Sequence, residues 1–202
     1  MQRTWVVIDT ETGGLDPQQH SILSLALVVW QNEKIDDELL INIKEDEIVA
    51  TDTALRINGI DLRTHEGDDP MQAVERIKAF FLKNNIFKQA HMAGHNVASF
   101  DYGFVKRLYR LAGADIDKTF HYRMLDTMTM ALALDQVGRL PGLRGYGLDG
   151  LCQRFGIQIR KAGAGVPHNA LEDARATAKL MSRLLDMVRN THLEVPNNPT
   201  EE

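Results

Sequence analysis

The chain has 202 residues, a formal net charge of −5, 44% hydrophobic residues and one cysteine. That composition predicts one domain with a sizeable core, and it excludes an internal disulfide framework. No apolar run approaches the roughly 18 residues of a membrane helix, and the start lacks a signal-peptide apolar region, so a cytoplasmic protein is expected. The acidic balance counts against a nonspecific nucleic-acid binder, unless metal ions neutralise several acids.

The first predicted element begins in the segment 6–14, Val-Val-Ile-Asp-Thr-Glu-Thr-Gly-Gly. The apolar run that glycines end predicts a strand buried on both faces. Because side chains alternate along a strand, Asp9 and Glu11 point to the same side, about 6.5–7 Å apart along the chain. Two adjacent anions there need either a hard divalent cation or contact with solvent, and this segment alone leaves both interpretations open.

The elements that follow predict an α/β fold, a mixed sheet with helices on both faces. Residues 21–30 and 37–43 read as strands joined by a hairpin at 31–34, so the first three strands form an antiparallel meander. Further strands are expected at 89–94 and ending at 124–127. Helices are expected at 52–57, from 70, from about 99 to 113, from 128 to 134, at 147–156, and from 170 onward.

Helical spacing of apolar residues predicts which side chains are buried. The helix from Pro70 would bury Met71, Val74, Ile77, Phe80 and Phe81, and the next would bury Phe100, Phe104, Val105, Leu108 and Leu111. The last helix, capped by Asn169, would bury Leu171, Ala174, Ala178, Met181, Leu185 and Val188. Cys152 lies among apolar neighbours, which favours a buried structural thiol over a nucleophile.

Four acids stand at the ends of predicted elements. Asp9 and Glu11 end the first strand, and Asp101 and Asp173 each lie near the start of a helix. A lone aspartate in a first helical turn is ordinarily a dipole or capping residue, but the four together suit two oxygen-ligated cations that clamp a phosphodiester. His168, five residues before Asp173, is either a general base or a surface loop residue.

These residues resemble the three motifs of the DEDDh 3′→5′ exonucleases, which have a ribonuclease-H-like fold. The motifs are Val-Ile-Asp-Thr-Glu-Thr-Gly-Gly, then His95-Asn96 with Phe100-Asp101, then His168-x4-Asp173. The segments Asn58-Gly59-Ile60 and Leu125-Asp126-Thr127 also match, and residues 147–157 look like a late helix of the proofreading epsilon subunit of bacterial DNA polymerase III.

The resemblance implies a role for each matching position. Asp9, Glu11 and Asp173 would ligate the tighter metal, Asp9 would bridge to a second one, and Asp101 would act there largely through water. His168 would be the base. Thr12 and Leu15 match positions that touch the 3′-terminal nucleotide, and Asn96 matches a polar residue near the scissile phosphate. This chain has three residues between His95-Asn96 and Phe100-Asp101 where the family commonly has two, which puts the roles of His95 and Asn96 in doubt.

The resulting hypothesis is an exonuclease that uses two Mg²⁺ or Mn²⁺ ions and releases 5′-mononucleotides from single-stranded or frayed DNA. An exoribonuclease similar to ribonuclease T, which trims RNA 3′ ends, is the alternative, since nothing in the sequence reports on the 2′-hydroxyl. A non-catalytic nucleic-acid or polymerase-binding module is the alternative of another class. A DNA polymerase partner and a homodimer both stay open. Residues 1–190 would form the exonuclease domain and 191–202 a flexible tail. Phosphate contacts are expected from basic residues near the site, although a solvated helix face explains the last three equally well: Arg139, Arg144, Arg160, Lys161, Lys106, Arg107 and Arg110.

Overall fold

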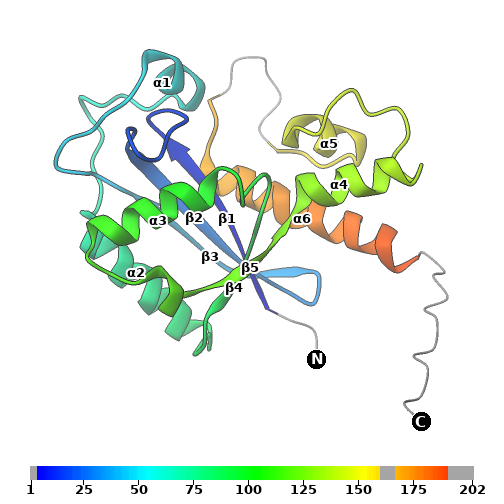
Figure 1. The fold of residues 1–202 in the computed structure, drawn as a ribbon, viewed down its shortest axis with the longest axis horizontal. Helices are drawn as coiled ribbons and strands as arrows, with labels where there is room; N and C mark the ends of the chain where they lie inside the picture. Colours follow the sequence, from blue (N-terminus) through cyan, green and yellow to red (C-terminus); the bar gives the residue numbers. More distant parts are fainter. Residues whose placement is uncertain (1–3, 160–166, 191–202) are drawn as a thin grey trace, which may run out of the picture.

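A computed structural model of the chain describes residues 4–159 and 167–190. Its centre is a mixed five-stranded sheet with the order β3-β2-β1-β4-β5 (Figure 1). β1 (Trp5–Thr12) pairs antiparallel with β2 (Ile22–Gln31) and parallel with β4 (Ala90–Gly94). β3 (Lys34–Asn42) pairs antiparallel with β2, and β5 (Phe120–Asp126) pairs parallel with β4. The mixed sheet predicted from the sequence is therefore confirmed.

The hairpin between β2 and β3 is tighter than the sequence predicted. Lys34 already pairs with Gln31, so β3 begins three residues before the expected position 37. Both turn residues, Asn32 and Glu33, have positive φ angles of 51° and 64°. A two-residue turn with both φ angles positive matches the right-handed twist of the flanking strands and lets them pair up to the turn.

Helices cover both faces of the sheet (Figure 1). α2 (Pro70–Lys83) and α3 (Asp101–Leu111) pack on one face, and α6 (Ala170–Arg189) packs on the other. α4 (Thr127–Gln136) and α5 (Leu148–Arg154) pack on the outer side of α6 in a separate apolar cluster. α1 (Asp52–Asn58) lies beside the carboxyl end of β1, and one short 3₁₀ helix, Ile116–Lys118, was not anticipated.

The burial of α6 corrects part of the sequence interpretation. Ala174, Ala178 and Met181 pack on the sheet as predicted, but a second stripe of Ala176, Leu180 and Leu184 packs on α4 and α5. A helix that lies between two layers buries two stripes, whereas the single-face pattern anticipated only one. Leu171 and Leu185 are partly buried and pack on the sheet cluster.

Three residues assigned to buried helix faces are exposed. Met71, Leu111 and Val188 have 62%, 45% and 46% of their surface accessible. Each stands in the first or last turn of its helix, beyond the elements that cover the middle of the helix. Cys152 is buried, as predicted. In the part of the chain that the structure describes, no helix combines the length and apolar character needed to cross a membrane. The predicted tail at 191–202, and Arg160 and Lys161, lie outside the described residues.

Candidate active site

Alternation along β1 divides the residues at its carboxyl end between two faces of the sheet. Val7 faces the cluster with α6, whereas Val6 and Ile8 face the cluster with α2 and α3. Asp9 and Glu11 continue the α6 side, and Thr10 continues the α3 side. The two glycines beyond the strand are needed for close packing, since a Cβ on Gly13 would lie 2.2 Å from the Val49 carbonyl oxygen.

Three carboxylates converge on the α6 side of β1. Asp9, Glu11 and Asp173 each offer an oxygen, and these three oxygens lie within 4.8 Å of one another. Asp173 is 4% exposed, in the first turn of α6, where Asn169 caps the helix through its contacts with the Leu171 and Glu172 amides. An all-oxygen set of this kind fits Mg²⁺ or Mn²⁺, and a soft thiol or imidazole set would not.

Asp101 reaches the same end of β1 from the α3 side and is not a member of that three-oxygen group. Its carboxylate accepts a 2.8 Å hydrogen bond from the Thr10 hydroxyl, and its side chain is almost wholly enclosed. Burial raises the pKa of Asp101 to about 7, and the hydrogen bond from Thr10 opposes that rise. Thr10, which was not predicted as a site residue, therefore connects Asp101 to the strand that carries Asp9 and Glu11.

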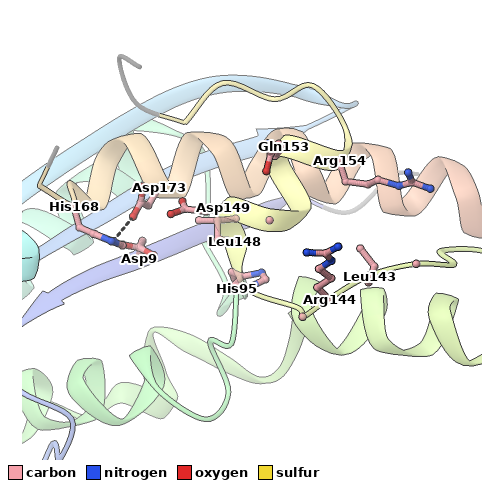
Figure 2. Close-up of a pocket in the computed structure, with 14 residues that line it drawn as sticks. Asp9, His95, Leu143, Arg144, Leu148, Asp149, Gln153, Arg154, His168 and Asp173 are labelled. Atoms are coloured by element: carbon pink, nitrogen blue, oxygen red, sulfur yellow. Dashed lines mark hydrogen bonds and ion pairs between the residues drawn. The ribbon is translucent and has the colours of Figure 1, made fainter. Parts of the chain in front are cut away.

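His168 lies on the segment that leads into α6, at the rim of the acidic cluster. Its Nδ1 lies 3.2 Å from the Asp173 Oδ2, and a dashed line marks this contact in Figure 2. Its backbone N–H donates to the carbonyl of Ile57 at the end of α1. Gly59, with a φ of 68°, packs on Pro167, and an added Cβ there would lie 2.6 Å from that ring. The end of α1 therefore fixes the position of His168.

The extra residue before Phe100-Asp101 is accommodated in a turn that follows β4. Asn96 adopts a φ of 61°, and the amides of Asn96 and Ala98 donate to the side chain of Asp126 at the end of β5. The same carboxylate accepts the Met128 and Thr129 amides, which makes it the N-cap of α4. The turn thus absorbs the additional residue, and Asp101 stays in place at the start of α3.

His95 precedes that turn and is held between β4 and α4. Its Nδ1 lies 2.9 Å from the Thr127 hydroxyl, which in turn donates to the Gly94 carbonyl. Burial lowers the pKa of His95 and so favours the neutral ring, while the charge of Asp126 opposes the change.

A first cavity of about 600 Å³ opens on one side of the acids. Its wall includes the predicted substrate residues Thr12, Leu15 and Asn96, together with Phe100, which also packs on Phe104 in the core. Leu15 is 83% exposed. We call this space the strand-end cavity.

Hydrogen bonds hold the wall of the strand-end cavity in place. The Thr12 hydroxyl donates to the Gly14 carbonyl, and the Asn58 amide donates to the Thr12 carbonyl. The His20 ring packs against Gly14, where an added Cβ would lie 2.4 Å from it. His20 is therefore a structural part of this wall.

A second cavity of about 790 Å³ opens on the other side, toward α5 (Figure 2). Arg144 and Arg154 line it, together with glycines 142, 145, 147 and 150. We call this space the glycine cavity. Arg144 was predicted as a phosphate contact and Arg154 was not, because one arginine on a short helix carries no signal of its own.

Arg107 does not point to the site, which corrects its assignment as a candidate phosphate ligand. Its guanidinium pairs with Glu45 at 2.7 Å, and both side chains are largely buried. It also donates to the carbonyls of Pro17 and Gln18, so it braces the loop that carries Leu15. Lys106 and Arg110 are exposed, and Arg139 contacts the carbonyl of Met187 near the end of α6.

Residues 6–181 match a family model described as exonuclease, of the RNase_T type. The chain belongs to this exonuclease family. The match spans most of the chain and confirms both the predicted resemblance to the DEDDh 3′→5′ exonucleases and the prediction of a nuclease. Because the family is one of nucleases, the match does not support the alternative of a non-catalytic nucleic-acid or polymerase-binding module.

The chain is similar in sequence to DNA polymerases and similar in structure to an exonuclease. The chain is 30% identical over 187 residues to the PolC-type DNA polymerase III of Thermotoga maritima, and 28% identical over 189 residues to that of Listeria monocytogenes. These matches cover 92% and 94% of this chain but only 12% of each relative. The crystal structure of E. coli exonuclease I in complex with a dT13 oligonucleotide superposes with a TM-score of 0.75 and 19% identity. That superposition covers 93% of this chain and 44% of the exonuclease I chain, and it shows a shared fold.

Proposed function

We propose that this protein removes 5′-mononucleotides from the 3′ end of single-stranded or frayed DNA with the help of two divalent cations. The observation that carries the proposal is the convergence of three carboxylate oxygens within 4.8 Å at the end of β1. Membership of the exonuclease family supports the reaction type. The acids stand at the junction of two cavities, where a phosphodiester has room on both sides.

Asp9, Glu11 and Asp173 would hold the tighter cation, and Asp9 and Asp101 would act on the second. When bound, the two cations supply an activated water and stabilise the charge on the leaving oxygen. His168, at the rim of the cluster, would take the proton of the attacking water. Attack at phosphorus then breaks the bond to the 3′-oxygen of the preceding nucleotide, which gives a 5′-mononucleotide and a strand with a new 3′-hydroxyl.

Thr12 and Leu15 would hold the terminal nucleotide in the strand-end cavity. The Thr12 hydroxyl uses its hydrogen on the Gly14 carbonyl, so its oxygen remains able to accept a hydrogen bond from a terminal 3′-hydroxyl. The exposed Leu15 presents an apolar surface to a base. Asn96 is placed on the same wall, within the turn that Asp126 holds.

DNA is favoured over RNA because the similar proteins are DNA polymerases and an exonuclease that was crystallised with a deoxythymidine oligonucleotide. No described contact distinguishes the 2′-hydroxyl, so RNA 3′-end trimming is the alternative substrate. The DNA polymerase partner and the homodimer stay predictions, since the chain spans about an eighth of its polymerase relatives.

Digestion of two 5′-labelled single strands of the same sequence, one DNA and one RNA, tests the proposal. With Mg²⁺, the DNA should shorten from its 3′ end to a ladder, and chelation or Asp9→Asn should abolish the ladder. A ladder on RNA alone would replace DNA by RNA in the proposal. No ladder on either strand would overturn the proposed activity.

A further inference from the structure

The strand-end cavity and the glycine cavity meet at the acidic cluster. Both are lined by Asp9, His95, His168 and Asp173. A phosphodiester bound at those acids has a nucleotide on each side, and each cavity can take one of the two. If the terminal nucleotide lies against Thr12 and Leu15, as proposed above, the rest of the strand leaves through the glycine cavity.

Charge is distributed unevenly along the glycine cavity. Figure 2 shows Arg144 and Arg154 away from His168 and Asp173, with Asp149 on the side of the acids. Both arginines are exposed. The two arginines lie at the outer part of the cavity, and the acidic cluster lies at its inner end. This arrangement suits a polyanion, because the arginines can contact its phosphates while bound metal would hold the scissile phosphate alone.

Gly150 gives the strongest indication of a ligand. It is the third residue of the seven-residue helix α5, where glycine is less favourable than alanine. Neither packing nor conformation requires glycine there. Among the described residues, no atom beyond the adjacent helix backbone lies within 4 Å of a Cβ built on Gly150, and its φ is not in the left-handed region. Gly150 lowers the stability of the helix, is not required by packing and lines a cavity. The close approach of a molecule from outside the protein explains a glycine at this position.

We propose that the nucleotides immediately upstream of the scissile bond lie in the glycine cavity, with their backbone against Gly150 and their phosphates near Arg144 and Arg154. This inference rests on the proposed nuclease function and adds the path of the strand. Contacts with phosphates and with a bare helix backbone do not read bases, so the path accepts any sequence. A cavity of this kind also requires an unpaired strand of some length upstream of the cleaved nucleotide.

The variant Gly150→Ala separates this role from a structural one. Alanine should leave the melting temperature equal or higher, because it favours the helix. Its methyl group should raise the KM for a single-stranded oligodeoxythymidylate on the order of tenfold with little change in kcat, since it blocks the approach of the strand. Hydrolysis of the p-nitrophenyl ester of thymidine 5′-monophosphate, which has no upstream nucleotide, should stay unchanged.

The arginines are tested by salt dependence. Arg144→Gln and Arg154→Gln should each weaken binding of a labelled single strand, measured by fluorescence anisotropy in EDTA, and each should reduce the slope of log K against log salt concentration by about 0.7. Arg183→Gln, an exposed arginine of α6 outside the cavity, is the matched control and should leave affinity and slope unchanged.

The outcomes distinguish this inference from the proposed function. Equal losses on the oligonucleotide and on the nucleotide ester, or unchanged KM and affinity in the cavity variants, would overturn the strand path. If the wild-type protein hydrolyses neither substrate, the nuclease proposal fails. Weaker and less salt-dependent binding by the arginine variants would then still support the strand path.

Discussion

The two sides of β1 present the same functional group in two different environments. On the α6 side, Asp9, Glu11 and Asp173 bring their oxygens together at the junction of two open cavities. On the α3 side, Asp101 also lines the strand-end cavity, but it accepts a hydrogen bond from Thr10, and burial raises its pKa to about 7. Carboxylates at one strand end thus converge on one face, while burial favours the protonated form of a carboxylate on the other face. The difference comes from which helix covers each face.

The largest effect should come from the open side. Asp9→Asn keeps the size of the side chain but removes the charge that holds a cation, so the rate of oligonucleotide hydrolysis should fall by about 10³-fold or more. The melting temperature in EDTA should not fall. Asp46→Asn, a change of the same kind at an exposed acid away from the cluster, is the control. A rate within about tenfold of the wild type would contradict the assignment.

His168 tests whether the rim of the open side takes part in the reaction. Removal of a general base typically lowers the rate by 10²–10⁴-fold, and we expect His168→Ala to fall in that range. The His168 ring contacts Asp173 but is not one of the three clustered carboxylates. Mg²⁺ should therefore still raise the melting temperature of the His168→Ala variant. A neutral-pH rate equal to that of the wild type would leave His168 as a loop residue.

Asp101 on the enclosed side should affect stability through pH. With a pKa raised from 3.8 to about 7 in the folded state, the folded protein holds a proton that the unfolded chain has lost between those values. The stabilising contribution is present at low pH and is lost as pH rises through 7. Asp101→Asn should therefore raise the melting temperature of the chelator-treated protein by several degrees at about pH 8 and far less at about pH 4, near the unfolded pKa. An equal effect at both pH values would show that the enclosed carboxylate is not protonated.

Thr10 should have the smallest effect. Thr10→Val removes the donor to Asp101 and should lower the free energy of unfolding by about 1–2 kcal/mol in EDTA at about pH 8. Thr10→Ser keeps the hydroxyl and serves as the control in urea titrations. If valine and serine proved equally stable, the hydrogen bond would not hold the carboxylate.

The sequence was sufficient for features set by local pattern. Alternation along one strand placed Asp9 and Glu11 together, and the cap at Asn169 placed Asp173 at the start of α6. Pattern alone could not assign Asp101 to the opposite side, because that depends on which face α3 covers. The pairing of Arg107 with Glu45 joins residues 62 positions apart, and no local signal reveals it. The second buried stripe of α6 was missed for the same reason, since it depends on α4 and α5.

The side chain of Asp126 has a consequence for how the protein can vary. It accepts four backbone amides, two from the turn after β4 and two from the start of α4. Backbone amides are present whatever side chain a residue carries, so Ala98, Met128 and Thr129 keep these contacts through most substitutions. Tolerance to substitution is therefore expected at Ala98, Met128 and Thr129, and intolerance at Asp126, which lies far from them in the sequence.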